Sequence, residues 1–168
     1  MLLAIDPSIN SCGIAVFDQS LVFAKTIRVK PDTKLDIAER CRFIALEVFR
    51  TVKHFWVLEI AHEWPQIYKS DTPARANSVI TMAAVNLAID TLLLGCQTNS
   101  YLPAEIWGQL PKSKTGSAWA SPRGKRIKSR LSEAELKLVP DQHDVVDAVG
   151  IGLHHLGRLG IRHVNVSG

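Results

Sequence analysis

The chain opens with the stretch LLAIDPSINSCGIAVFDQSLVFAKTIRV at residues 2–29, and this stretch decides the fold. It contains three short apolar runs, Leu2–Asp6, Gly13–Phe17 and Leu21–Val29, separated by turn-forming residues. Connections this short join antiparallel neighbours, because a parallel crossover needs a dozen or more residues. The stretch therefore predicts an antiparallel, three-stranded meander.

Helix and strand patterns alternate after the meander. Apolar residues recur at helical spacing from Ile37 to Val52, with Asp32 or Thr33 as the candidate cap. The later predicted elements are a buried strand Phe55–Ala61, a helix Asp71–Leu94, a strand Thr98–Leu102, a loop Trp107–Ala120, a basic helix from Ser121, a capping box Ser132–Glu135 and a helix Gln142–Leu159. This order predicts an α/β fold with a mixed five-stranded sheet, flanked by helices, in which the later strands run parallel to the first.

Length and composition limit the class of protein. The chain has 168 residues and 46% hydrophobic residues, which predicts a single domain over residues 1–168 with an ordinary core. The most hydrophobic stretch of the sequence is interrupted by Asn86 and Asp90, so no membrane-spanning helix is expected. Three widely spaced cysteines without a CxxC motif argue against disulfides and zinc. An N-terminus without a signal peptide favours a cytoplasmic location.

The positive charge is concentrated in one segment, which we call the basic strip. The net charge is +4, yet residues 111–130 contain seven cations and no acid, so the rest of the chain carries −3. Such a strip is typical of a polyanion-binding surface, although a solvated helix face has the same composition. The candidate DNA-binding residues are Lys112, Lys114, Trp119, Arg123, Lys125, Arg126, Lys128 and Arg130.

Four acids are predicted to converge. Asp6 ends the first strand and Glu63 follows the fourth, and the carboxyl ends of neighbouring parallel strands meet at one sheet edge. Asp144 and Asp147 are three residues apart on the last helix and share a face. Capping of a turn by Asp6 and a favourable helix-dipole interaction at Asp144 are the structural alternatives. Together, the carboxylates suit two Mg²⁺ or Mn²⁺ ions that cleave a phosphodiester.

These residues resemble a known family. The segment Leu3–Ser8 with Cys12–Val16 is similar to the opening of RuvC-type Holliday junction resolvases, although Ser8 stands where glycine is commoner. His62–Gln66 is similar to the second acidic motif of phage-type members, and His143–Gly152 to the C-terminal motif. The matches occur in order along essentially the whole chain.

The resemblance implies an RNase H-like fold, a homodimer, Mg²⁺ dependence and paired nicking of four-way DNA junctions. It favours Glu63 over Glu59 as the second carboxylate ligand, although both have the same strand parity. A general branched-DNA or flap nuclease and a noncatalytic junction-binding module remain alternatives. An actin-like or sugar-kinase-like ATPase would need a second lobe, for which the chain has no room.

Several other side chains adjoin these motifs. His62 and His143 each stand next to an acid, where they could orient water or protonate a leaving oxygen, but packing or capping is the favoured interpretation. Core packing is also favoured for Trp64 and Trp107, whereas Trp119 has equal claims to DNA contact and packing. Cys12 is expected to be a small buried residue rather than a nucleophile.

Overall fold

A mixed five-stranded sheet forms the centre of the protein. The computed structural model describes residues 1–30, 34–66, 72–111 and 116–160. The strands are β1 (Leu2–Asp6), β2 (Ser11–Asp18), β3 (Ser20–Arg28), β4 (Glu59–Glu63) and β5 (Gln97–Tyr101). Their order across the sheet is β3-β2-β1-β4-β5, with β1, β2 and β3 antiparallel, β4 parallel to β1, and β5 parallel to β4. The predicted meander and the parallel later strands are confirmed.

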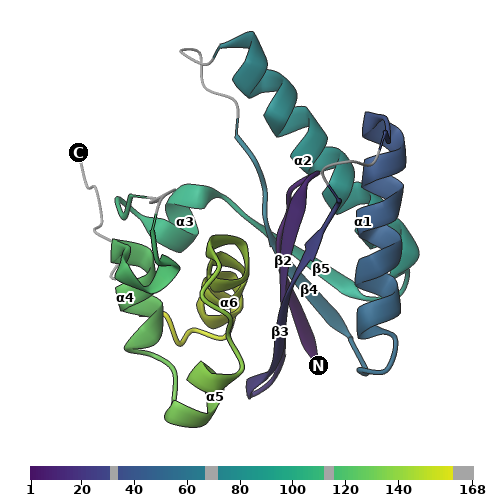
Figure 1. The fold of residues 1–168 in the computed structure, drawn as a ribbon. Helices are drawn as coiled ribbons and strands as arrows, with labels where there is room; N and C mark the ends of the chain where they lie inside the picture. The colour runs from purple at the N-terminus through teal and green to yellow at the C-terminus, as the bar shows by residue number, and fades with distance from the viewer. Residues whose placement is uncertain (31–33, 67–71, 112–115, 161–168) are drawn as a thin grey trace, which may run out of the picture.

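Helices cover both faces of the sheet. They are α1 (Ile37–Val52), α2 (Pro73–Leu92), α3 (Pro103–Trp107), α4 (Pro122–Lys128), α5 (Glu133–Lys137) and α6 (His143–His155), with a 3-10 turn at Ala118–Ala120. Figure 1 shows α1 and α2 on the right of the sheet and α6, accompanied by α3, α4 and α5, on the left. Among the helices described, none is long and apolar enough to cross a membrane.

Strand β1 is buried on both faces and divides the core into two clusters. Leu3 and Ile5 pack with residues of α1 such as Ile44, whereas Leu2 and Ala4 pack with residues of α6. This alternation follows from the two-residue period of a strand. Side chains of β1 with even numbers therefore face α6, and those with odd numbers face α1 and α2.

The structure corrects several predicted boundaries, including that of α6, which ends at His155 and not at Leu159. Helix α1 is capped by Asp36 in a capping box with Glu39, whereas the predicted caps at positions 32 and 33 lie outside the described residues. Strand β4 begins at Glu59, because the preceding apolar residues form a connection in which Trp56 is 81% exposed. Residues 103–107, the last of which is predicted to begin a loop, form α3 with its proline at the first turn.

Candidate active site

Asp6 lies at the carboxyl end of β1 and is 5% exposed. Its even-numbered position places it on the α6 face of the sheet, in line with Leu2 and Ala4. Gly13 is its partner on β2. A carboxylate is thus buried where the central strand ends, beneath the start of α6.

Glu63 is the last residue of β4 and lies beside Asp6. In the parallel pairing, His62 is opposite Ile5, so the next residues along the two strands, Glu63 and Asp6, end side by side. Glu63 shares a face with Ala61, which packs in the cluster around α6. The two carboxylates therefore approach the same end of α6, as the sequence predicts.

The start of α6 brings two further acids to this edge. A Cβ on Gly13 would lie 2.0 Å from the carbonyl oxygen of Asp144, so only glycine permits this close approach of helix and strand. The Ser11 hydroxyl donates to Asp144 Oδ2 at 2.5 Å. Asp147, one turn further along α6, is 5% exposed. Gly13 thus lets the start of α6 lie close over β2, next to the strand that carries Asp6.

The pKa of the Cys12 thiol is affected by burial and by nearby charges. Burial raises its pKa well above its usual value, and the carboxylates of Asp6 and Asp144 raise it further. Both carboxylates thus act on one buried point, and a thiol with so high a pKa is no nucleophile at neutral pH. The predicted packing role of Cys12 is confirmed.

Glu59 lies on the same face of β4 as Glu63 but at the other end of α6. His155 Nε2 donates to Glu59 Oε2 at 3.0 Å, and the Tyr101 hydroxyl is hydrogen bonded to His155 Nδ1 at 2.8 Å. The two glutamates are four positions apart along the strand, a distance of about 13 Å. Glu59 therefore has a separate partner, away from the gathered acids.

His62 is buried on the opposite face of the sheet, and this placement favours packing. Its Nε2 lies 3.6 Å from Asp90 Oδ2 and 3.5 Å from the Ser100 hydroxyl. His143 begins α6, and its Nε2 donates to the Gly116 carbonyl at 3.2 Å. Both histidines thus have structural contacts in place.

A chain of contacts links two of the acids through α3 and α4. The Trp107 indole N–H donates to Glu63 Oε2 at 2.6 Å. The Arg123 guanidinium lies over the Trp107 ring at 4.3 Å from its centroid and places Nη1 3.6 Å from Asp147 Oδ2. A strand acid and a helix acid are thereby held by neighbouring side chains.

Comparisons with solved structures identify the architecture. The chain is similar to Thermus thermophilus RuvC in complex with a Holliday junction substrate, with a TM-score of 0.63, 21% identity and coverage of 92% of this chain and 90% of that one. A second Thermus thermophilus RuvC structure gives 0.57, 18% and 92% of both chains. The yeast mitochondrial Holliday junction resolvase Ydc2 gives 0.55, 13%, and 94% and 81%. The chain has the RuvC fold.

The RuvC fold confirms the predicted RNase H-like fold class. No protein-family model and no curated protein sequence matches the chain. The likeness that the comparisons show therefore lies in the arrangement of the sheet and helices.

The donor set at the carboxylate edge of this RuvC fold consists of oxygens, which suit Mg²⁺ or Mn²⁺. Within the described residues, no three Asp, Glu, His or Cys side chains are close enough together to enclose an ion as they stand. Asp144 accepts from Ser11, Glu63 accepts from Trp107, and Asp147 pairs with Arg123. Three of the four acids therefore already have partners within the chain.

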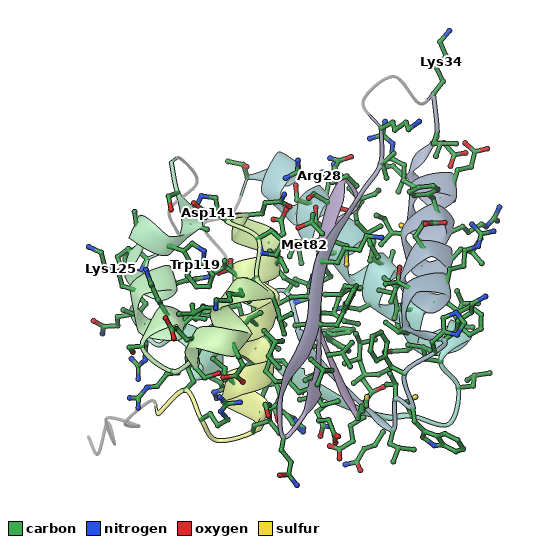
Figure 2. All side chains as sticks on the ribbon, turned by 60° about the horizontal axis from the view of Figure 1, so that its bottom comes forward. Arg28, Lys34, Met82, Trp119, Lys125 and Asp141 are labelled. Atoms are coloured by element: carbon green, nitrogen blue, oxygen red, sulfur yellow. The ribbon has the colours of Figure 1, made fainter. Side chains whose placement is uncertain are left out.

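The basic strip lies on the α6 side of the sheet, mainly on α4. Lys125, Lys128 and Arg130 are exposed, and Lys125 points away from the molecule in Figure 2. Arg126 donates to the carbonyls of Leu159 and Gly160, so two of its hydrogen-bond donors are used within the chain. Lys112 and Lys114 lie outside the described residues.

Two candidate DNA-binding residues, Arg123 and Trp119, have contacts within the protein. The Arg123 side chain is 13% exposed and faces Trp107 and Asp147, so we reassign it from DNA contact to the carboxylate site. Trp119 is half-buried and packs against the core cluster around α6, which favours packing.

Sequence reasoning missed the roles of Trp107, Arg123 and Ser11 near the acids. The core position of Trp107 was predicted and is confirmed at 2% exposure, but its bond to Glu63 spans 44 residues. One sequence signal was available: Pro103 is typical of the first turn of a helix, and it could have indicated the short helix that ends at Trp107.

Proposed function

We propose that this chain is a structure-selective endonuclease that resolves four-way DNA junctions by metal-dependent hydrolysis, with paired nicks. The proposal is supported by the placement of Asp6 and Glu63 at the neighbouring ends of β1 and β4, and of Asp144 and Asp147 in the first turns of α6, which packs on Gly13 beside Asp6. The similar structures are junction resolvases, one of them solved with its junction substrate. We place this activity in one RNase H-like domain over residues 1–168.

The four carboxylates would hold two Mg²⁺ or Mn²⁺ ions. Ions bound in such a pair activate a water molecule and stabilise the leaving oxygen of a phosphodiester. Burial of Asp6 and Asp147 supports this role, because gathered acids in a water-poor site repel one another unless cations neutralise them. The protein contributes by fixing the carboxylates on a strand end and a helix start.

The exposed cations of the basic strip would hold the DNA backbone. Lys125, Lys128 and Arg130 lie on or directly after α4, beside the helix that carries Asp144 and Asp147. Flexible cations bind phosphates without reading bases. This fits a nuclease that recognises branch shape rather than sequence.

Paired nicking requires two active sites, so we propose a homodimer that uses α2. Ile80 and Leu87, one heptad apart on this helix, are 59% and 56% exposed although they are large and apolar. An apolar surface of this kind fits a second copy related by two-fold symmetry. Light scattering is expected to give twice 18.6 kDa; a monomer both with and without junction DNA would contradict the dimer.

The decisive experiment compares four-way, three-way, flap and linear DNA of equal length in Mg²⁺. Four-way junctions are expected to be cut fastest, with nicks in two opposite strands. Equal cutting of flaps and junctions would indicate a general branched-DNA nuclease. Tight junction binding without cleavage in Mg²⁺ or Mn²⁺ would indicate a noncatalytic binding module.

A further inference from the structure

The indole of Trp107 makes a directed contact with one oxygen of Glu63. The donor–acceptor distance is 2.6 Å, and the ring is 2% exposed. A buried indole N–H needs an acceptor, and here that acceptor is a carboxylate at the candidate metal site. The contact fixes the orientation of Glu63 and leaves its second oxygen, Oε1, for another partner.

The surroundings of Trp107 hold the ring in one place. A Cβ on Gly150 of α6 would lie 2.5 Å from the ring atom Cη2, so the indole rests directly on the helix backbone. The Arg123 guanidinium lies over the ring, at 4.3 Å from its centroid. Arg123 is itself anchored, because its Nε donates to the Leu110 carbonyl at 3.1 Å. The ring has little freedom to turn away from Glu63.

The same ring connects the strand ligand with the helix ligands. Gly150 lies one turn after Asp147 on α6, and the Arg123 guanidinium pairs with Asp147 at 3.6 Å. Trp107 therefore sets the position of Glu63 relative to α6. Donors behind a metal ligand orient it, and their removal typically reduces metal affinity or activity about 10- to 100-fold.

We propose that Trp107 is a positioning residue for the metal site, acting through its N–H bond to Glu63, and that Arg123 braces it. The inference rests on the proposed function, since it assigns Glu63 as a metal ligand. Packing alone would require only a ring of this size. The proposed role requires the N–H.

The test is the substitution Trp107→Phe, measured by calorimetric titration with Mn²⁺ in the absence of DNA. Phenylalanine keeps an aromatic ring beneath Arg123 but lacks the donor, so Mn²⁺ affinity is expected to fall about 10- to 100-fold. Trp119→Phe is the matched control, because Trp119 packs on the same cluster from a separate element, the 3-10 turn. The control is expected to bind Mn²⁺ as the parent chain does.

Two further measurements separate positioning from packing. Benzothienylalanine at position 107 keeps the two-ring shape without the N–H, and it should reproduce the fall in affinity with unchanged thermal unfolding. In a Glu63→Gln background, Trp107→Phe should cause little additional fall, because Trp107 is proposed to act on the ion through the Glu63 carboxylate, which this background lacks.

Unchanged Mn²⁺ affinity in Trp107→Phe or in the benzothienylalanine variant, with the parent chain binding Mn²⁺, would overturn the positioning role and leave the proposed function intact. A parent chain that neither binds Mn²⁺ nor cuts junctions would overturn both.

Discussion

The two ends of α6 hold acidic side chains in contrasting surroundings. Near its C-terminal end, Glu59 accepts from His155 at 3.0 Å, and Glu135 pairs with Arg158, which follows the helix, at 3.0 Å. At its N-terminal end, Asp144 and Asp147 lie next to the strand ends that carry Asp6 and Glu63, and Arg123 approaches Asp147 at the longer distance of 3.6 Å. Acids with individual partners stabilise a fold, whereas gathered acids repel one another unless a cation joins them.

The contrast predicts that conservative substitutions at the two ends have opposite consequences. Substitution of an acid near the N-terminal end of α6 should abolish activity and leave stability unchanged. Substitution of an acid near the C-terminal end of α6 should lower stability, and the protein that stays folded should cleave DNA at the parental rate.

The largest expected effect is on cleavage by Asp6→Asn. Removing a metal ligand should lower the rate of junction cleavage about 10³-fold or more, while junction binding and thermal unfolding stay close to those of the parent chain. Single-turnover cleavage with saturating enzyme measures the decrease. Glu63→Gln should behave in the same way.

Glu59→Gln is the matched control, because it lies on the same strand and face but pairs with His155. It should cleave at nearly the parental rate. A Glu59→Gln enzyme that is inactive beside an active Glu63→Gln enzyme would reverse the ligand assignment.

The next effect is on the stability of Glu135→Gln. Glu135 is 4% exposed; burial acts to raise its pKa, but hydrogen bonds from Arg158 and from the backbone N–H groups of Leu21 and Ser132 outweigh burial and lower the pKa from 4.5 to about 2. A lowered pKa means that the carboxylate stabilises the folded state above pH 4.5 and that this contribution is lost as the pH falls towards 2. The substitution should cost about 2 to 3 kcal/mol at pH 7.

Urea unfolding at pH 7 and near pH 2.5 measures this effect. The difference between the parent chain and Glu135→Gln should shrink at the lower pH, where the parent carboxyl begins to take up its proton. Equal stability of the two proteins at pH 7 would show that the Arg158 pair contributes nothing.

The smallest effect is expected from the joint replacement of Lys125, Lys128 and Arg130 by alanine. These exposed cations should add to DNA affinity by neutralising phosphates, so the variant should bind every DNA more weakly. Its salt dependence should also be flatter, by about 0.9 in log–log slope for each phosphate that is no longer neutralised. Arg126 is kept because it holds the carbonyls of Leu159 and Gly160. An unchanged salt slope would assign these side chains to a solvated surface, and Mn²⁺ affinity should not change in either case.

The parts of the fold that depend on local pattern were predictable. Strand Leu2–Asp6 has the predicted bounds, because a continuous apolar run meets an acid and a proline. The capping box at Ser132 and Glu135 is confirmed, since its residues are close in sequence. The start of β4 was not predictable, because Trp56 and Leu58 are apolar yet exposed, and composition cannot distinguish a buried run from an exposed one.

The sequence offers the candidate acids but not their contacts. The strand-end positions of Asp6 and Glu63 and the helical spacing of Asp144 and Asp147 are local features, and the topology brings the two strand ends and the start of α6 to one edge of the sheet. The contacts of Trp107 with Glu63 and of Arg123 with Asp147 join segments 44 and 24 residues apart through three helices, and no spacing in the sequence encodes them.

The candidate site depends on the register in which β1 pairs with β4. His62 is opposite Ile5, and this register places Glu63 next to Asp6 on the α6 face. A slip of one residue would exchange the faces of β4, so that His62 would take the place of Glu63 beneath α6. Such a misfolded chain would keep its strands and helices, and its circular dichroism would look native. On the proposed function, such a chain would lose its metal affinity, so a Mn²⁺ titration would count the correctly registered molecules in a preparation.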